Sequence, residues 1–252
     1  LWFEHAASRQ LLEQAGAALA PAFSQTLGCI PLGCDMGGGP DGDRRIAIDT
    51  LAPTLRLLAY HPQGSVSELA GQHVQGSLAA CGSGDGAYCG GAHYAEGRLL
   101  AEGQAGLWSR GQAWAMLGLV QAAGVYGEPF LSEARRACEY WLQTRPEALP
   151  TNRLDQPEAG VDPSAVVIAA LAMLGLDGLA EQSQPWRAQA ERLLAAVLDS
   201  RYVVLDGASP GLFGGMHYRT REGEGLVESS CSSFFLLLAL LVLDGQAGAL
   251  DC

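Results

Sequence analysis

The stretch WSRGQAWAMLGL, residues 108–119, decides how the rest of the chain is interpreted. It mixes small residues with large apolar ones, so we predict a closely packed helix that begins at Ser109. Arg110 and Trp114 are four positions apart and share one helical face, and Trp108 lies just before the first turn. A guanidinium beside two indoles suits a carboxylated sugar, because it binds a carboxylate through two parallel bonds while the indoles contact the ring. The alternative is a core helix whose arginine pairs with a buried acid.

Helices of the same apolar kind recur along the chain. The pattern predicts four of them, which begin near Asp49, Ser109, Asp162 and Glu228. Amphipathic helices alternate with these and begin near Ser65, Glu128 and Gln184. A helix that is apolar all round is buried, whereas one with a polar stripe faces solvent. The alternation therefore predicts an all-α fold, a barrel with an inner and an outer ring of helices.

Long glycine-rich segments precede the predicted inner helices. Residues 27–43, 81–106 and 201–225 are predicted loops, with a short β-excursion in the second. Loops of this length in a compact domain are usually functional. We expect them to gather at one end of the barrel and to form the pocket, with His93 as a ligand contact.

Composition limits the classes of partner. The chain has 252 residues, 48% of them hydrophobic, and its net charge is −12. We predict one globular domain over residues 1–252 that binds neither nucleic acid nor an anionic membrane surface. The most apolar run, residues 234–243, is too short to span a bilayer. Seven cysteines without metal-ligand spacing predict no metal site, and reduced thiols in a cytoplasm-like compartment.

Residues 108–114 resemble the signature of glycoside hydrolase family 88, the unsaturated glucuronyl hydrolases. Three further segments are similar to that family, in the same order along the chain. They are IDTL with LRLL (48–51 and 55–58), DPSA with IAA (162–165 and 168–170), and GLFGG, GLVES and FF (211–215, 225–229 and 234–235). The related unsaturated rhamnogalacturonyl hydrolases share the barrel but usually carry another version of the motif, so they rank second.

The resemblance implies an (α/α)6 barrel and a hydrolase of unsaturated uronate oligosaccharides that acts in polysaccharide degradation. The enzyme hydrates the C4=C5 double bond of the terminal uronate, and the hemiketal that results opens and releases the sugar. Asp49 would be the catalytic acid and base. The residues that would hold the substrate are Trp108, Arg110, Trp114, His93 and Gln112. The resemblance implies no metal and no cofactor.

The chain departs from the family pattern in four respects. Depending on the gap, Tyr88, Cys89 or His93 takes the place of the family's histidine in the loop before residues 108–114. The family's second important aspartate is expected before Leu1, and about two hairpins on the N-terminal side are lacking, which suggests a fragment. The last helix has Ser232-Ser233-Phe234-Phe235 where the family has glycine, aspartate and two tyrosines. An inactive sugar-binding barrel is therefore the second alternative. On position alone, Asp49 and Asp162 could each cap a helix, and Asp162 could also face the pocket rim.

Overall fold

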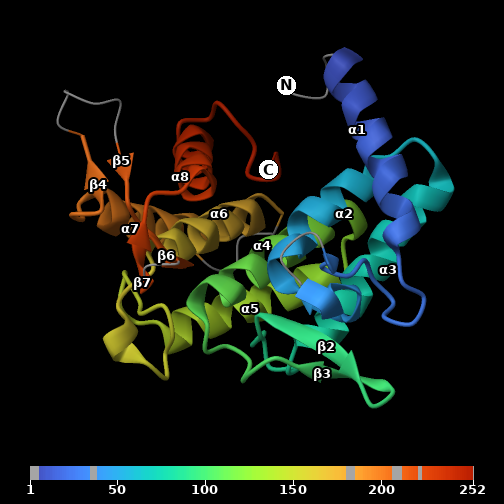
Figure 1. Cartoon of the computed structure of the whole chain (residues 1–252). Coiled ribbons are helices and arrows are strands. Elements are labelled where there is room, and N and C mark those ends of the chain that lie inside the picture. Colours follow the sequence, from blue (N-terminus) through green and yellow to red (C-terminus); the bar gives the residue numbers. More distant parts are fainter. Residues whose placement is uncertain (1–5, 35–38, 180–184, 206–211, 221–222, 252) are drawn as a thin grey trace. The chain divides into compact units, whose positions relative to one another are not determined.

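The computed structural model describes residues 6–34, 39–179, 185–205, 212–220 and 223–251 (Figure 1). The chain forms two compact units. The first comprises residues 1–82 and 88–104, and the second comprises residues 83–87 and 105–252. The predicted start of a helix at Gln184 and the glycine at position 211 lie outside the described residues. The prediction of a single domain stays a prediction.

The first unit combines helices with one small sheet. Its helices are α1 (Ala6–Leu19), η2 (Ala20–Ala22), η4 (Gly39–Arg44), η5 (Ile48–Thr50), α2 (Leu51–Ala59) and α3 (Gly64–Cys81). Its strands are β1 (Arg45–Ala47), β2 (Gly91–Ala95) and β3 (Arg98–Ala101), which pair antiparallel in the order β1-β2-β3. Arg45 lies opposite His93 in this sheet. Helix α2 packs against α1 and α3, and its buried side chains include Leu51, Leu55 and Leu58.

The second unit contains three of the four predicted inner helices, and the fourth, α2, lies in the first unit. The helices of the second unit are α4 (Ser109–Tyr126), α5 (Phe130–Thr144), η6 (Pro157–Ala159), α6 (Pro163–Leu179), α7 (Trp186–Leu198) and α8 (Ser230–Leu243). Four strands lie between α7 and α8. Strand β4 (Val203–Val204) pairs with β5 (Leu212–Phe213), and β6 (Met216–Thr220) pairs with β7 (Gly223–Val227). Helix α4 packs against α5 and α6, and α6 also packs against α7 and α8. Figure 1 shows α4 and α6 in the middle of this unit.

Helices α4 and α6 are buried because their sequences offer almost no polar face. Every residue of α4 from Ser109 to Ala123 is buried, and so is every residue of α6 from Pro163 to Leu176. By contrast, α5 buries one stripe, through residues such as Phe130 and Trp141. The predicted alternation of inner and outer helices is therefore confirmed for α4, α5 and α6, whereas α8, another predicted inner helix, keeps part of its surface exposed.

Three helix starts differ from the predicted ones, and the first is that of α5, which begins at Phe130 rather than near Glu128. Helix α2 begins at Leu51 after Thr50, and Asp49 lies in the preceding turn η5. Helix α8 begins at Ser230 rather than near Glu228, because strand β7 continues to Val227. The start of α6 is as predicted, with Pro163 in the first helical position, where its missing N–H costs nothing.

The glycine-rich segments hold more structure than predicted. The β-excursion in residues 81–106 is confirmed as β2 and β3. The prediction of a plain loop over residues 201–225 is wrong, because four strands begin there. Glycines weaken the strand signal in the sequence, yet Gly225 pairs with Tyr218 in the ladder of β6 and β7.

Helix α8 is apolar but keeps one face open to solvent. Phe234 is 49% exposed and Leu237 is 58% exposed. Across the described part of the chain, no helix combines the length and the apolar character that crossing a membrane requires.

Candidate active site

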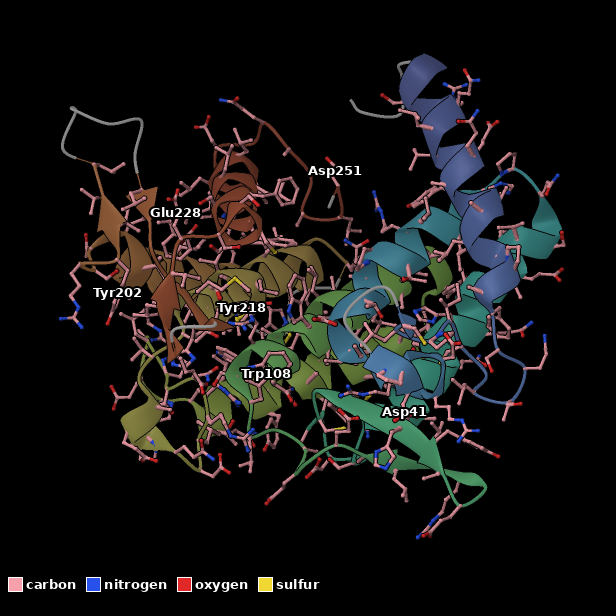
Figure 2. All side chains as sticks on the ribbon, viewed as in Figure 1. Asp41, Trp108, Tyr202, Tyr218, Glu228 and Asp251 are labelled. Carbon is pink, nitrogen blue, oxygen red and sulfur yellow. The ribbon has the colours of Figure 1, made fainter. Side chains whose placement is uncertain are left out.

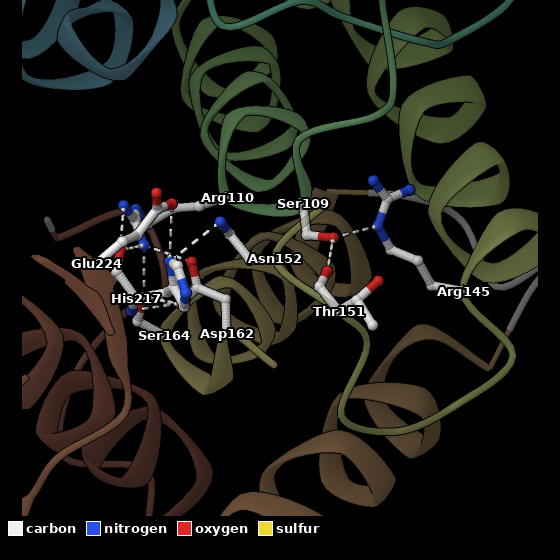
Figure 3. A network of polar contacts seen from close by, with 9 residues as sticks. All are labelled: Ser109, Arg110, Arg145, Thr151, Asn152, Asp162, Ser164, His217 and Glu224. Atoms are coloured by element: carbon white, nitrogen blue, oxygen red, sulfur yellow. Dashed lines mark hydrogen bonds and ion pairs between the residues drawn. The ribbon is translucent and has the colours of Figure 1, made fainter. Parts of the chain in front are cut away.

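The start of α4 is fixed by contacts with the loop before α6. The first N–H groups of a helix have no partner inside the helix. The N–H of Ser109 donates to the carbonyl oxygen of Asn152 at 2.8 Å, and its hydroxyl donates to the carbonyl oxygen of Thr151 at 2.6 Å. These bonds hold the residues of the motif at the position where the chain enters the helix (Figure 3).

Arg145 supports the same position from the end of α5. Its Nε donates to the Ser109 hydroxyl at 3.1 Å, and its Nη2 donates to the carbonyl oxygen of Gly106 at 2.6 Å. The guanidinium carbon lies 4.7 Å from the centre of the Trp141 ring. Burial lowers the pKa of Arg145 to about 10, so the side chain still carries its charge at neutral pH.

Arg110 forms a buried ion pair with Asp162. The side chain of Arg110 is 9% exposed and that of Asp162 is fully buried. Nη1 of Arg110 donates to Oδ2 of Asp162, and both terminal nitrogens donate to the carbonyl oxygen of His217 at 3.0 Å. The Ser164 hydroxyl donates to Oδ1 of Asp162 at 2.5 Å. Burial raises the pKa of Asp162, while Arg110 and Ser164 act in the opposite direction. The bonds to Asp162 and to the His217 carbonyl hold the guanidinium of Arg110 in one orientation.

His217 joins strand β6 to this ion pair. Its side chain is 6% exposed, and Nδ1 lies 3.1 Å from Nδ2 of Asn152 and 3.5 Å from Oε1 of Glu224 (Figure 3). Asn152 and Glu224 come from the loop before α6 and from β7. The position of β6 beside α4 is thus fixed through both the backbone and the side chain of His217.

Trp108 covers the guanidinium of Arg110. Its ring centre lies 5.3 Å from the guanidinium carbon, and Figure 2 labels this tryptophan where the chain enters α4. A Cβ atom on Gly111 would collide with the Trp108 ring. The glycine of the motif therefore leaves the space that the indole occupies.

The other two predicted residues of this helix lie in the core. Trp114 is 8% exposed and meets Phe235 of α8 edge to face, with ring centres 5.2 Å apart. Gln112 is fully buried, and its side-chain nitrogen donates to the carbonyl oxygens of Gly86 at 2.8 Å and Ala137 at 3.3 Å. Among the predicted binding residues of the second unit, the structure brings Trp108 and Arg110 together and directs Trp114 and Gln112 inward.

Asp49 and His93 belong to the first unit. Asp49 is exposed in the turn η5, between the buried residues Ile48 and Leu51. The side chain of His93 is 43% exposed, and its Nδ1 lies 3.9 Å from Oε1 of Glu102. Arg45 holds that carboxylate through two bonds of 3.0 and 2.8 Å.

A cavity of about 400 Å³ lies beside this sheet. Its lining includes Asp41, Arg44, Arg45, His93, Tyr94 and Glu102. Charges of both signs line it, and His93 is the predicted binding residue that reaches it. Within the residues described, no group of three or more His, Cys, Asp or Glu side chains has the arrangement of a metal site.

Sequence reasoning missed Asn152, Arg145 and Glu224. Each lies in a loop or at an element end, where one polar residue carries no local pattern. Asp162 was visible as a helix cap, but its ion pair with Arg110 joins residues 52 positions apart. Only the predicted packing of two inner helices could have suggested this pair.

No family model and no curated protein matches the chain. Solved structures do match. The unsaturated glucuronyl hydrolase from Bacillus sp. GL1, described as responsible for the degradation of glycosaminoglycan, superimposes with a TM-score of 0.83 at 23% identity. The match covers 96% of this chain and 69% of that one.

Two further solved structures extend the comparison. A UGL variant with dGlcA-Glc-Rha-Glc gives a TM-score of 0.83 at 24% identity, again over 96% of this chain and 69% of the other. A possible member of the GH105 family from Salmonella enterica gives 0.73 at 16% identity, over 94% of this chain and 66% of the other. The chain therefore has the α/α-barrel fold of the unsaturated glucuronyl hydrolases, as its sequence resemblance predicts.

Proposed function

We propose that this chain is a glycoside hydrolase that hydrates the C4=C5 double bond of an unsaturated uronate at the end of an oligosaccharide. The observation that carries the proposal is the Arg110 guanidinium, fixed by Asp162 and covered by Trp108, at the start of an inner helix in this fold. A rigid cation beside an indole face fits a carboxylated, flat sugar ring.

Arg110 and Trp108 bind the uronate in this proposal. The bonds of Arg110 to Asp162 and to the His217 carbonyl use Nη1 and Nη2, and Nε takes no part in them. Trp108 is only partly buried, so its ring can contact a ligand. The solved UGL variant with dGlcA-Glc-Rha-Glc supports an oligosaccharide of this kind as the ligand.

Asp49 supplies the acid and base chemistry. Its carboxyl group protonates C4, a water molecule adds its oxygen to C5, and the proton that this water loses returns to the carboxylate. The product is a hemiketal at C5. The ring opens there, and C1 then releases the next sugar as an alcohol. The exposure of Asp49 in its turn is compatible with contact to a ligand.

The other predicted residues take different roles. His93 is half exposed beside a cavity, so it contacts substrate. Gln112 is fully buried and Trp114 packs its ring against Phe235, so in this proposal they act on the site through the residues that they hold in place. Gln112 fixes the loop that contains Gly86, and Trp114 fixes α8 through Phe235.

An absorbance assay tests the proposal. The folded chain is incubated with unsaturated disaccharides from lyase digests of glycosaminoglycans, and with the saturated disaccharides as a control. We expect the ultraviolet absorbance of the conjugated double bond to disappear, with no cleavage of the saturated sugars. Cleavage of both kinds would contradict the hydration mechanism.

Two outcomes of this assay favour the alternatives. A preference for unsaturated rhamnogalacturonan fragments would favour the GH105-like enzyme, since a possible member of that family shares the fold. Saturable binding without turnover would favour an inactive sugar-binding barrel. The observation behind the second alternative is α8, which offers the ring of Phe235 to Trp114 where the resemblance leads one to expect a tyrosine.

A further inference from the structure

Cys81 and Cys89 face each other across a short antiparallel pairing in the first unit. Gly82 and Tyr88 form an isolated antiparallel bridge, and one step outward from this bridge places Cys81 opposite Cys89. The N–H of Cys89 donates to the carbonyl oxygen of Cys81 at 2.9 Å. On the other side of the bridge, the N–H of Ser83 donates to the carbonyl oxygen of Ala87 at 3.0 Å. Cys81, the last residue of α3, and Cys89 are thus joined by one backbone hydrogen bond directly next to the bridge.

The register of these two residues fits a disulfide bond. Residues that lie opposite each other in an antiparallel pairing have Cα atoms about 4.5–5.5 Å apart, and disulfide bonds join Cα atoms about 4.4–6.8 Å apart. The Cys89 thiol donates to the carbonyl oxygen of Gly91 at 3.0 Å. The interaction between the two thiols lowers the pKa of Cys89 and, together with burial, raises the pKa of Cys81. Both residues are 2% exposed, and both carry free thiols.

The two thiols lie at the base of a loop that leaves the first unit. The chain passes into the second unit at residue 83 and returns at residue 88. Within the second unit, the Gly86 carbonyl accepts from Gln112 and the Gly84 carbonyl accepts from Arg136 at 3.1 Å. A covalent bond between Cys81 and Cys89 would therefore close a loop in which the carbonyl groups of Gly84 and Gly86 already accept hydrogen bonds.

We propose that Cys81 and Cys89 are a dithiol that oxidises to a disulfide and so closes the loop of residues 82–88. The co-reactant is a low-molecular-weight disulfide such as glutathione disulfide. The Cys89 thiolate attacks one of its sulfur atoms, which forms a mixed disulfide and releases one glutathione. The Cys81 thiol gives up its proton and attacks the Cys89 sulfur, which releases the second glutathione. Two protein thiols are oxidised, and one glutathione disulfide is reduced to two thiols.

Other buried cysteines provide the internal controls. Cys29 lies near Cys81, and burial raises the pKa of Cys29 to about 11. Cys138 is fully buried in α5, and burial raises its pKa as well. Neither pairs with another cysteine through a ladder register, so we expect both to remain reduced. The proposal is independent of the hydrolase activity.

The test uses the whole chain and peptide mapping. The unfolded protein is refolded in buffers with different ratios of reduced to oxidised glutathione, and acid then stops thiol exchange. The protein is unfolded in denaturant at neutral pH with an excess of N-ethylmaleimide, which alkylates its free thiols, and a protease that cuts before aspartate cleaves it at Asp85. Because Asp85 lies between the two cysteines, a disulfide leaves two peptides joined, and dithiothreitol separates them. We expect this linked pair, and a thermal midpoint about 5 °C above that of the reduced protein.

Variants make the result specific. Cys81→Ser and Cys89→Ser abolish the linked pair, whereas Cys138→Ser keeps it. Complete alkylation of Cys81 and Cys89 in the wild-type chain at every glutathione ratio would overturn the proposal. A disulfide that joins Cys29 to either residue would overturn it too. Both of these readouts use the wild-type protein, so a variant that fails to fold does not affect them.

Discussion

At the scale of single residues, Arg110 and Asp162 show what a sequence motif can and cannot reveal. Each alternative for Arg110, a sugar-binding side chain or a structurally paired one, follows from the motif alone. The structure shows the pair with Asp162, and this pair also orients the guanidinium beside Trp108. The residues near Arg110 in the sequence could not identify this partner, because the ion pair depends on how α4 packs against α6. The role of Arg110 as a ligand contact stays a prediction.

The ion pair predicts a large stability effect at one aspartate. Asp162→Asn removes the charge that compensates a buried guanidinium, so we expect the free energy of unfolding to fall by about 3 kcal/mol. Asp155→Asn is the matched control, because Asp155 pairs with Arg153 at an exposed position. Urea denaturation compares the two. Equal midpoints for both variants would contradict the structural role of the buried pair.

His73 predicts how stability depends on pH. Its side chain is fully buried in α3, and Nδ1 accepts a hydrogen bond from the N–H of Ile30 at 3.2 Å. Burial lowers the pKa of His73 from 6.5 to about 4. Below pH 6.5 the unfolded chain binds a proton that the folded chain does not bind. The free energy of unfolding should therefore fall by up to about 3 kcal/mol as the pH falls toward 4.

His73→Asn separates this effect from other titrations. The asparagine oxygen can replace Nδ1 as the acceptor, and the side chain does not titrate. We expect the dependence of the unfolding free energy on pH between 6.5 and 4 to become flatter than in the wild type. Urea midpoints at several pH values measure this, with pH 8 as the reference for lost packing. An unchanged slope would show that His73 is not responsible.

At the scale of elements, the helices and the β-excursion in residues 81–106 could be predicted, whereas the strands in residues 201–225 could not. The sequences of α4 and α6 are apolar on every side, which requires burial on every side. Strands β6 and β7 contain glycines and charged residues, and their register places Tyr218 opposite Gly225. Propensity is weak in such segments, so tertiary contacts decide their structure.

The loop between α3 and β2 predicts a difference between two glycines. Gly84 and Gly86 have φ angles of +87° and +94°. A Cβ on Gly84 would meet nothing within 4 Å, whereas one on Gly86 would lie 2.6 Å from the carbonyl oxygen of Arg136. Both alanine variants carry backbone strain, but only in Gly86→Ala does the new Cβ atom also collide with the backbone of Arg136. We expect Gly86→Ala to lower the unfolding free energy by about 2 kcal/mol more than Gly84→Ala.

Thermal or urea unfolding of the two variants checks this difference. Because both residues lie in the same loop at similar φ angles, the comparison cancels the strain that they share. A larger loss in Gly84→Ala would contradict the close approach of the loop to α5.

At the scale of the whole molecule, the fold could be predicted from the alternation of apolar and amphipathic helices together with one motif. The solved structures support that fold at identities of 24% or less. The division into two compact units could not be predicted, because it depends on where residues 83–87 make their contacts. Within the second unit, the structure brings Trp108 and Arg110 of the candidate site together.

The central claim is that Asp49 drives the hydration of an unsaturated uronate. The most direct measurement is the rate at which the double-bond absorbance of an unsaturated disaccharide disappears with the wild-type chain, with Asp49→Asn, and with Asp43→Asn as a second exposed aspartate of the same unit. We predict that Asp49→Asn lowers the rate at least about 100-fold without a loss of helical circular dichroism, and that Asp43→Asn retains it. A folded Asp49→Asn variant with the wild-type rate, or a folded wild-type chain that consumes no unsaturated uronate, would contradict the account.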